Sequence, residues 1–446
     1  MADLSNNLTA ALGQATRLAD MRGRLLFLLG GLVVFRVGTY LPVPGIDPAR
    51  VAEFFAKQSG TILGLANMFT GGALQRLSIF SMGVMPYISA SIIVQMMSMV
   101  VPSLHALRKE GESGRRKITQ YTRYLTVPLA MFQAYGAAVA LESGKLVYVQ
   151  GFQFLFVATV TMTAGTVFLM WLGEQITERG MGNGISMIIL TGIVANIPRD
   201  IGNTLDRVST GEMGAPFFIL LLAVIVMVTG FCVFMERAQR RIAVNYAKRQ
   251  VGRRVFQGQV SHLPFKLNMS GVIPPIFASS ILVFPATIAQ FFAQSPEPNW
   301  WQSILQTVSS TLNSGQPLHI MLYAGLIVFF CFFYTALMIN SRETAENLQK
   351  SGAFIPGIRP GQQTAGYIDK VLTRLTMWGA FYVMGVCVLP EILRASSNVP
   401  FAFGGTSLLI VVVVIMDFMA QMSAHLMSHQ YESLLKKANL SGRGRT

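Results

Sequence analysis

Apolar residues recur along this chain in long stretches, separated by short polar segments in which Lys and Arg are frequent. An α-helix needs roughly 20 apolar residues to cross the hydrocarbon core of a bilayer. Ten stretches have about this length, at residues 24–41, 77–101, 124–141, 152–173, 184–203, 216–235, 271–293, 318–339, 371–390 and 401–422. The pattern predicts an all-α polytopic membrane protein with ten transmembrane helices.

Two local features interrupt this pattern. Residues 61–74 (TILGLANMFTGGAL) are apolar but too short to span a bilayer, and Gly71 and Gly72 end any helix there. This segment is predicted to be a re-entrant or interfacial half-helix. Pro86, Pro274 and Pro275 fall inside the second and seventh predicted spans, where proline permits a helix to bend.

The composition excludes a soluble protein and leaves little room for an enzyme. Of the 446 residues 52% are hydrophobic and 12% are charged, whereas soluble domains carry about 25% charged residues. Ten spans leave only connecting loops outside the membrane. The pair His425 and His429 has helical spacing but no third ligand nearby, so we expect no metal site, no cofactor and no catalytic residue.

The basic residues predict the orientation of the chain. Segments 1–24, 102–121, 174–183, 236–270, 340–370 and 423–446 hold 25 of the 35 Lys and Arg residues. Such an excess marks cytoplasmic loops, so both termini are expected in the cytoplasm. Five spans in each half would give the halves opposite orientations, an inverted pair with residues 1–203 as the N-terminal half and 204–446 as the C-terminal half.

One cytoplasmic loop is more basic than orientation requires. Residues 236–256 carry seven basic residues and one acidic residue. Interleaved with Tyr246 and Phe256, this charge suits a large acidic partner, either protein or RNA.

The interior of the predicted bundle offers few ionisable groups. Arg36 and Asp417 are the clear cases, and each lies near a span end, where it can snorkel or pair. Aliphatic faces such as Val84 with Ile88, or Ile185 with Ile189, ordinarily serve packing. The residues alone leave three classes open: a channel, a small-solute secondary transporter with inverted repeats, and a membrane scaffold.

Six sequence blocks resemble the SecY/Sec61 alpha family of protein-translocation channels, in order and over essentially the whole chain. They are GALQRLSIFSMGVMPYISASIIVQ from Gly72, GESGRRKITQYTRY from Gly111, MWLGEQITERGMGNGIS from Met170, RRIAVNYAKRQVGRR from Arg240, SGAFIPGIRPG from Ser351 and FGGTSLLIVVVVIMDF from Phe403. The resemblance implies a channel for unfolded secretory polypeptides, with two inverted halves, an hourglass pore and a lateral opening through which transmembrane segments reach the lipid.

The resemblance also assigns roles to individual positions. The apolar pore ring falls on Val84, Ile88, Ile185, Ile189, Ile276 and Ile410, and Val84 is smaller than the isoleucine expected there. The half-helix 61–74 corresponds to a plug, with Asn67, Met68, Phe69, Thr70, Gly71 and Gly72 as its core. The lateral gate falls on Ser89, Gln95, Asn268, Ser279 and Phe284.

The partners are likewise implied by the resemblance. Arg253, Arg254 and Arg359 match positions that receive the ribosome or the motor ATPase SecA, and the subunits SecE and SecG complete the complex. The other expected partners are a preprotein with its signal sequence and membrane lipid. The expected location is the plasma (inner) membrane, and no enzymatic activity is expected.

Overall fold

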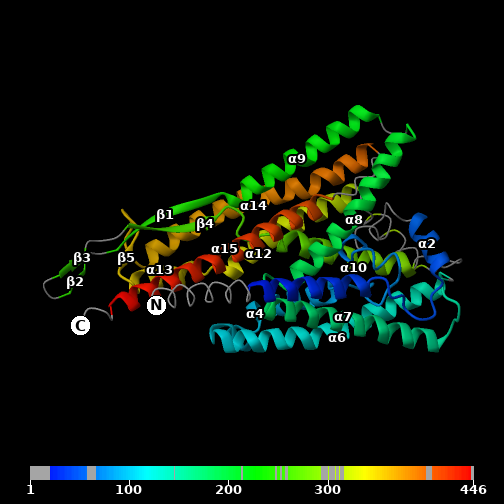
Figure 1. The fold of residues 1–446 in the computed structure, drawn as a ribbon, viewed down its shortest axis with the longest axis horizontal. Coiled ribbons are helices and arrows are strands. Elements are labelled where there is room, and N and C mark those ends of the chain that lie inside the picture. The colour runs from blue at the N-terminus through cyan, green and yellow to red at the C-terminus, as the bar shows by residue number, and fades with distance from the viewer. Residues whose placement is uncertain are drawn as a thin grey trace, which may run out of the picture. The chain divides into compact units, whose positions relative to one another are not determined.

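The computed structural model is mostly helical (Figure 1). It describes residues 21–57, 67–144, 146–211, 214–246, 249–251, 254–256, 260–292, 300, 307, 311, 316–397 and 404–442. The chain forms two compact units. The first comprises residues 1–200, 287–306 and 414–446, and the second comprises 201–286 and 307–413. The division into halves at residue 203 remains a prediction.

The first unit begins with a helix over residues 21–38. It continues with α2 (Pro48–Lys57), α4 (Met85–Val100), α5 (Pro102–Lys109), α6 (Glu112–Ser143), α7 (Phe152–Arg179) and α8 (Gly184–Ser209), the last of which passes into the second unit after Asp200. Helices α4 and α5 meet at an angle of 98°. The bend falls at Val101, where Pro102 begins α5, because proline disfavours helical geometry in the residue before it.

Small side chains on α6 allow close helix packing against α7, which runs beside it (Figure 1). Ala130, Ala134 and Ala138 recur every four residues, so they share one face, and all three are fully buried. Lipid tails are as apolar as the helix surfaces, so helices in a bilayer associate largely through van der Waals contact. Close approach of the two backbones increases that contact. The face continues into a cluster that includes Leu141 and Phe154.

The second unit combines helices with a small sheet. Its elements are α9 (Ala215–Arg237), β1 (Gln239–Tyr246), β2 (Arg249–Val251), β3 (Arg254–Phe256), β4 (Val260–Lys266), α10 (Ile273–Phe292), α12 (Pro317–Met338), α13 (Ser341–Lys350), β5 (Ala353–Phe354), α14 (Gln362–Ser397) and α15 (Gly405–Gly442). α10 leaves this unit after Ala286 and α15 leaves it after Val413.

The two longest loops between spans meet in one antiparallel sheet with strand order β4-β1-β5. β1 and β4 pair from Gln239 with Lys266 to Asn245 with Val260, and β5 adds to the far edge of β1. Ile242, Val244 and Phe265 turn inward and pack with Ile368 and Leu372 of α14. We call this sheet, with residues 351–361 and the first three turns of α14, the platform.

All ten predicted spans overlap helices in the described residues, so the polytopic helical fold is confirmed. Seven helical stretches among these residues are long and apolar enough to cross a membrane, or eight if the bent pair α4–α5 counts as one. The strands were not predicted, because basic side chains obscure the alternation of β1. Its buried Ile242 and Val244 lie among exposed residues.

The start of the second span was predicted wrongly. Residues 77–84 form turns, and α4 begins only at Met85. Leu77 and Gly83 have positive φ angles of 44° and 57°, which a helix does not tolerate. Pro86 therefore lies in the first turn of α4, and Pro274 and Pro275 lie in the first turn of α10, where proline starts a helix without bending it.

Candidate channel site

The six ring residues lie on four helices or their ends. Val84 precedes the first residue of α4, Ile88 lies one turn later, and Ile185 and Ile189 lie in the first turns of α8. All four belong to the first unit. Ile276 on α10 and Ile410 on α15 belong to the second. Val84, Ile88, Ile189 and Ile410 are buried, whereas Ile185 and Ile276 are half-buried. Their convergence on one constriction stays a prediction.

The predicted half-helix, residues 61–74, does not remain helical to its expected end. Residues 61–66 lie outside the described residues, residues 67–69 are helical, and turns follow from Thr70. The Asn67 side chain organises these turns, because its Oδ1 accepts a hydrogen bond from Gln75 N at 2.8 Å. The backbone carbonyl oxygen of Asn67 accepts two more hydrogen bonds, from Gly72 N at 3.0 Å and from Thr70 Oγ1 at 3.1 Å.

Arg36 holds this segment from the first helix. Its Nη1 donates to the Gly71 carbonyl oxygen at 2.8 Å, and its Nη2 donates to the Tyr40 hydroxyl at 3.2 Å. The guanidinium groups of Arg36 and Arg76 lie 5.1 and 4.1 Å from the centroid of the Tyr40 ring. Arg36, which was expected to snorkel or to pair, is thus engaged by a backbone carbonyl oxygen and by Tyr40.

Two glycines allow the same segment to rest directly on α8. A Cβ atom added to Gly71 would lie 2.9 Å from Gly192 Cα, and one added to Gly192 would lie 3.0 Å from the Phe69 carbonyl oxygen. Gly71 also has a φ of 68°, which side chains other than glycine rarely adopt. We call the contact of residues 67–72 with Arg36 and Gly192 the seat.

The residues assigned to the lateral gate have different local environments. Ser89 and Gln95 are half-buried on α4, and Gln95 Nε2 donates to Ser91 Oγ at 2.9 Å. Ser279 is half-buried on α10 and donates to the Ile276 carbonyl oxygen at 2.9 Å. Phe284 belongs to α10, but its side chain lies outside the described residues.

Asn268, the remaining gate residue, is buried just before α10 and makes four hydrogen bonds. Its Nδ2 donates to Glu236 Oε1 at 2.6 Å and to the Gly271 carbonyl oxygen at 3.1 Å. Its Oδ1 accepts from Ser270 Oγ and from Gly271 N, both at 3.1 Å. The full capacity of the amide is thus used within the second unit.

The platform presents one of the three arginines proposed to bind partners. Arg359 is exposed on the loop between β5 and α14. Its carbonyl oxygen accepts a hydrogen bond from Thr364 Oγ1 at 3.0 Å, and the flanking Ile355 and Ile358 pack into the platform core. Arg254 lies on β3, with its side chain outside the described residues, and Arg253 lies outside them altogether.

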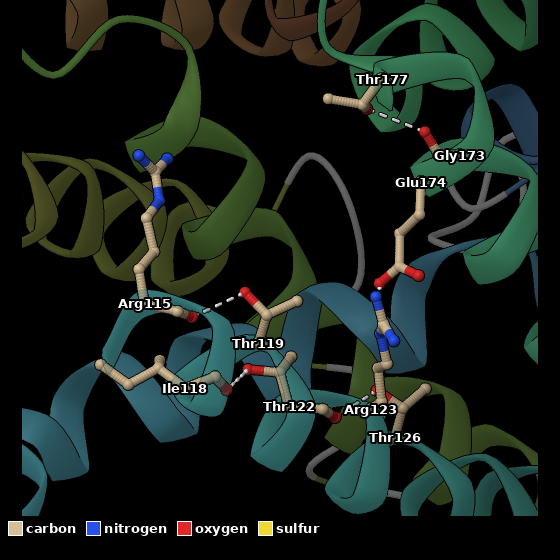
Figure 2. A network of polar contacts seen from close by, with 9 residues as sticks. All are labelled: Arg115, Ile118, Thr119, Thr122, Arg123, Thr126, Gly173, Glu174 and Thr177. Carbon is tan, nitrogen blue, oxygen red and sulfur yellow. Dashed lines mark hydrogen bonds and ion pairs between the residues drawn. The ribbon is translucent and has the colours of Figure 1, made fainter. Parts of the chain in front are cut away.

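An ion pair that the sequence did not reveal joins α6 to α7. Figure 2 shows Glu174 of α7 pointing toward Arg123 of α6, and Arg123 Nε lies 2.8 Å from Glu174 Oε1. One turn beyond Glu174, the Thr177 hydroxyl accepts a hydrogen bond from Gly184 N at 2.8 Å and so joins α7 to the start of α8. Residues 180–183 form the short connection between these two helices.

The only sequence signal for the ion pair and for the Glu236–Asn268 bond was an acidic residue near the end of each of two predicted spans. Glu174 and Glu236 each lie in the last two turns of a span-length helix. A carboxylate at that end of a helix opposes the helix dipole and therefore needs a local donor. That rule would have marked both residues for attention.

Comparisons with known proteins agree with the resemblance. A family model described as SecY matches residues 78–419. The chain is 59% identical over 430 residues to the protein translocase subunit SecY of Vibrio cholerae serotype O1, which covers 96% of this chain and 97% of that protein.

Solved structures share the fold. One, described as showing that the plug domain of the SecY protein stabilises the closed state of the translocation channel and maintains a membrane seal, has a TM-score of 0.65 and 15% identity. The match covers 92% of this chain and 93% of the chain in that structure. Another is Sec61 in the canine ribosome-channel complex from the endoplasmic reticulum, with a TM-score of 0.60, 14% identity and the same coverage.

Proposed function

Since this chain belongs to the SecY family, we propose that it passes unfolded polypeptides through a constriction formed by Val84, Ile88, Ile185, Ile189, Ile276 and Ile410. The chain is a protein-conducting channel and a subunit of a protein translocase. It is a multi-pass protein of the bacterial inner membrane and not an enzyme. The observation that carries this conclusion is the 59% identity, over 96% of the chain, to a translocase subunit.

Aliphatic side chains suit such a constriction for a physical reason. They make no directional bonds, so they can surround an extended polypeptide of any sequence. When the channel is empty, a narrow apolar bore expels water and therefore blocks ions. The same six residues would therefore accept a polypeptide of any sequence and would block ions when the channel is empty.

A lateral gate would serve the second task of the channel. We propose that α4 and α10 line it, and that the gate residues on or beside these helices are Ser89, Gln95, Asn268, Ser279 and Phe284. A sufficiently apolar segment of the translocating polypeptide would move sideways into lipid, because each buried methylene contributes about 0.8 kcal/mol. Half-buried hydroxyl and amide groups at the gate support this proposal, since they allow helices to pack and separate.

Ring variants test the conduit directly against the alternative of a small-solute transporter. Replacing Ile88, Ile189, Ile276 and Ile410 with Ser is expected to leave ATP-driven export of an unfolded precursor measurable. Resting ion conductance in planar bilayers should rise about tenfold or more, because a polar bore stays wet. A carrier would instead lose transport, since its substrate site would be altered.

The matched control for the ring is Ile219→Ser, on a side chain of α9 that is 69% exposed. This change should alter neither conductance nor export. Unchanged resting conductance in the ring variant would contradict the constriction, and export of a labelled small solute in place of the precursor would contradict the channel.

The seat is proposed to hold the plug, residues 61–74, in the closed channel. Three observations support this proposal: the 2.8 Å bond from Arg36 to the Gly71 carbonyl oxygen, the positive φ of Gly71 and the direct contact of Gly71 with Gly192. All three observations depend on the close contact of residues 67–72 with α8 and Arg36. A side chain that occupied the space between Gly192 and residues 69–71 would therefore destabilise the closed state.

Gly192→Val is expected to open the channel at rest. The new side chain needs the space occupied by the Phe69 carbonyl oxygen and the Gly71 backbone. Overpacking costs about 1–3 kcal/mol, which corresponds to about a fivefold to 150-fold shift toward the unseated state. Resting conductance should rise, and precursors with weak signal sequences should be exported better.

Gly202→Val on the same helix is the control, because a Cβ there meets no atom within 4 Å. It should behave as wild type in both assays. Equal behaviour of the two variants would remove Gly192 from the seat and leave residues 67–72 with a packing role only.

The partners are proposed from charge and from family membership. As a translocase subunit the chain works with others, and we propose SecE and SecG as those subunits. The structural neighbour in a ribosome-channel complex supports a ribosome as one partner of the platform, and SecA is proposed as the motor. The cytoplasmic loops 236–270 and 340–370 carry the positive charges of Arg253, Arg254 and Arg359. These charges suit rRNA phosphates or an acidic protein surface.

A further inference from the structure

We propose that Glu236 is a positioning residue that fixes Asn268 and thereby couples the platform to the start of α10. The proposal rests on the function above, in which α10 lines the gate. Glu236 is in the last turn of α9 and is 7% exposed, and Asn268 is 3% exposed. Their side chains meet at 2.6 Å across 32 residues of sequence.

The side-chain amide of Asn268 is fully hydrogen-bonded, so its orientation is fixed while the bond to Glu236 is present. The other three hydrogen bonds of its amide go to Ser270 and Gly271, in the turn that leads into α10. Gly271 has a φ of 62°, so the turn has a defined left-handed step. Glu236 thus orients the amide, and the amide orients the turn from which α10 begins.

The same junction is continuous with the sheet. Leu267 N donates to the Ala238 carbonyl oxygen at 2.9 Å, directly after the β1–β4 pairing of Gln239 with Lys266. The strand ladder, this backbone bond and the Glu236–Asn268 bond are three successive links between the two chain segments. Figure 1 shows β1 and β4 running together from the end of α9.

α14 supports the junction from another side. A Cβ atom on Gly379 would lie 2.6 Å from the Leu267 carbonyl oxygen, so the backbone of α14 packs directly on this segment. Nearer the N-terminus of the same helix, Ile368 and Leu372 pack into the platform core. The platform, the end of α9 and the start of α10 are therefore held together, and a force on the platform would reach α10 through Asn268.

A carboxylate at position 236 is costly unless it has such a purpose. It is buried, and it lies at the negative end of the dipole of α9. An apolar residue would be more stable there by both criteria. The hydrogen bond to Asn268 offsets part of that cost and gives the carboxylate its geometry.

The test compares Glu236→Ala, Glu236→Gln and wild type in vesicles that hold the full complex. In Glu236→Ala, amide hydrogen exchange of residues 268–276 should accelerate while residues 239–246 stay protected. The maximal rate of SecA-driven translocation should fall about fivefold or more, with the half-saturating SecA concentration unchanged. Glu236→Gln should recover most of both properties, because its amide oxygen can accept the same bond.

Glu346→Ala is the control for loss of a carboxylate in the same unit. Glu346 lies on α13 with a side chain that is 65% exposed, 4.0 Å from Lys350. It should match wild type throughout. A role of Glu236 in folding alone would instead lower protection across the whole unit and the amount of protein recovered.

Two results would overturn the proposal. Unchanged exchange at residues 268–276 in Glu236→Ala would show that the bond does not position Asn268. Accelerated exchange with a wild-type translocation rate would show that the junction does not couple to transport. Failure of the proposed function itself would be distinguishable, because the wild-type vesicles would then not translocate the precursor.

Discussion

Arg359→Glu should reduce SecA-driven translocation about 100-fold or more, while the chain still inserts and folds. The proposed docking surface on the platform would then present a negative charge to an acidic partner. Juxtaposed like charges cost several kcal/mol and misorient the partner. The measurement is ATP-dependent protection of an unfolded precursor in vesicles that contain the variant, beside wild type.

The structure explains why folding should be spared. The Arg359 side chain is exposed and forms no ion pair among the described residues. The loop is held by its backbone and its neighbours: Thr364 Oγ1 donates to the Arg359 carbonyl oxygen, and Ile355 is 5% exposed in the platform core. Substitution of an exposed charge usually changes stability by less than about 0.5 kcal/mol.

Arg342→Glu is the matched control, since it makes the same change of charge on an exposed position of α13. Its translocation rate should stay within about twofold of wild type, because rim charges alter association only modestly. Near-normal translocation by Arg359→Glu would remove this loop from partner binding. A thermal unfolding curve shifted well below wild type would instead give Arg359 a structural role.

A disulfide between cysteines introduced at Ser89 and Phe284 should stop export and release it on reduction. In the proposed gate, α4 and α10 separate when a signal sequence enters, and a covalent bridge prevents that movement. A disulfide forms only when the two Cα atoms lie within about 7 Å. Bridge formation therefore tests adjacency, and the export assay tests the need for separation.

The native cysteines do not interfere with this experiment. Cys232, Cys331 and Cys387 are buried and unpaired with one another, so gentle oxidation should act on the introduced pair. The single variants Ser89→Cys and Phe284→Cys are controls and should export normally in oxidant. Full export with the bridge formed would contradict gating by these helices, and a pair that never bridges would contradict their adjacency.

The sequence by itself determined the class of the protein and the position of nearly every span. Membrane insertion depends on the length of apolar stretches, and that length can be read directly from the sequence. Even α8, whose apolar core is short, forms a helix of 26 residues. The order of the six sequence blocks then identified the family, which the comparisons confirm.

Only the tertiary structure decided how individual polar groups are used. Arg36 and the Gly71 carbonyl oxygen are 35 residues apart in sequence, and Glu236 and Asn268 are 32 apart. Strand β5 joins β1 across about a hundred residues, from Ala353 to Tyr246. No local pattern encodes such pairings, because a hydrogen bond depends on distance and direction in space. The turns at residues 77–84 were not predicted for a related reason. Their apolar side chains resemble those of a membrane-spanning helix, whereas the positive φ angles of Leu77 and Gly83 exclude a helix and become visible only in the folded backbone.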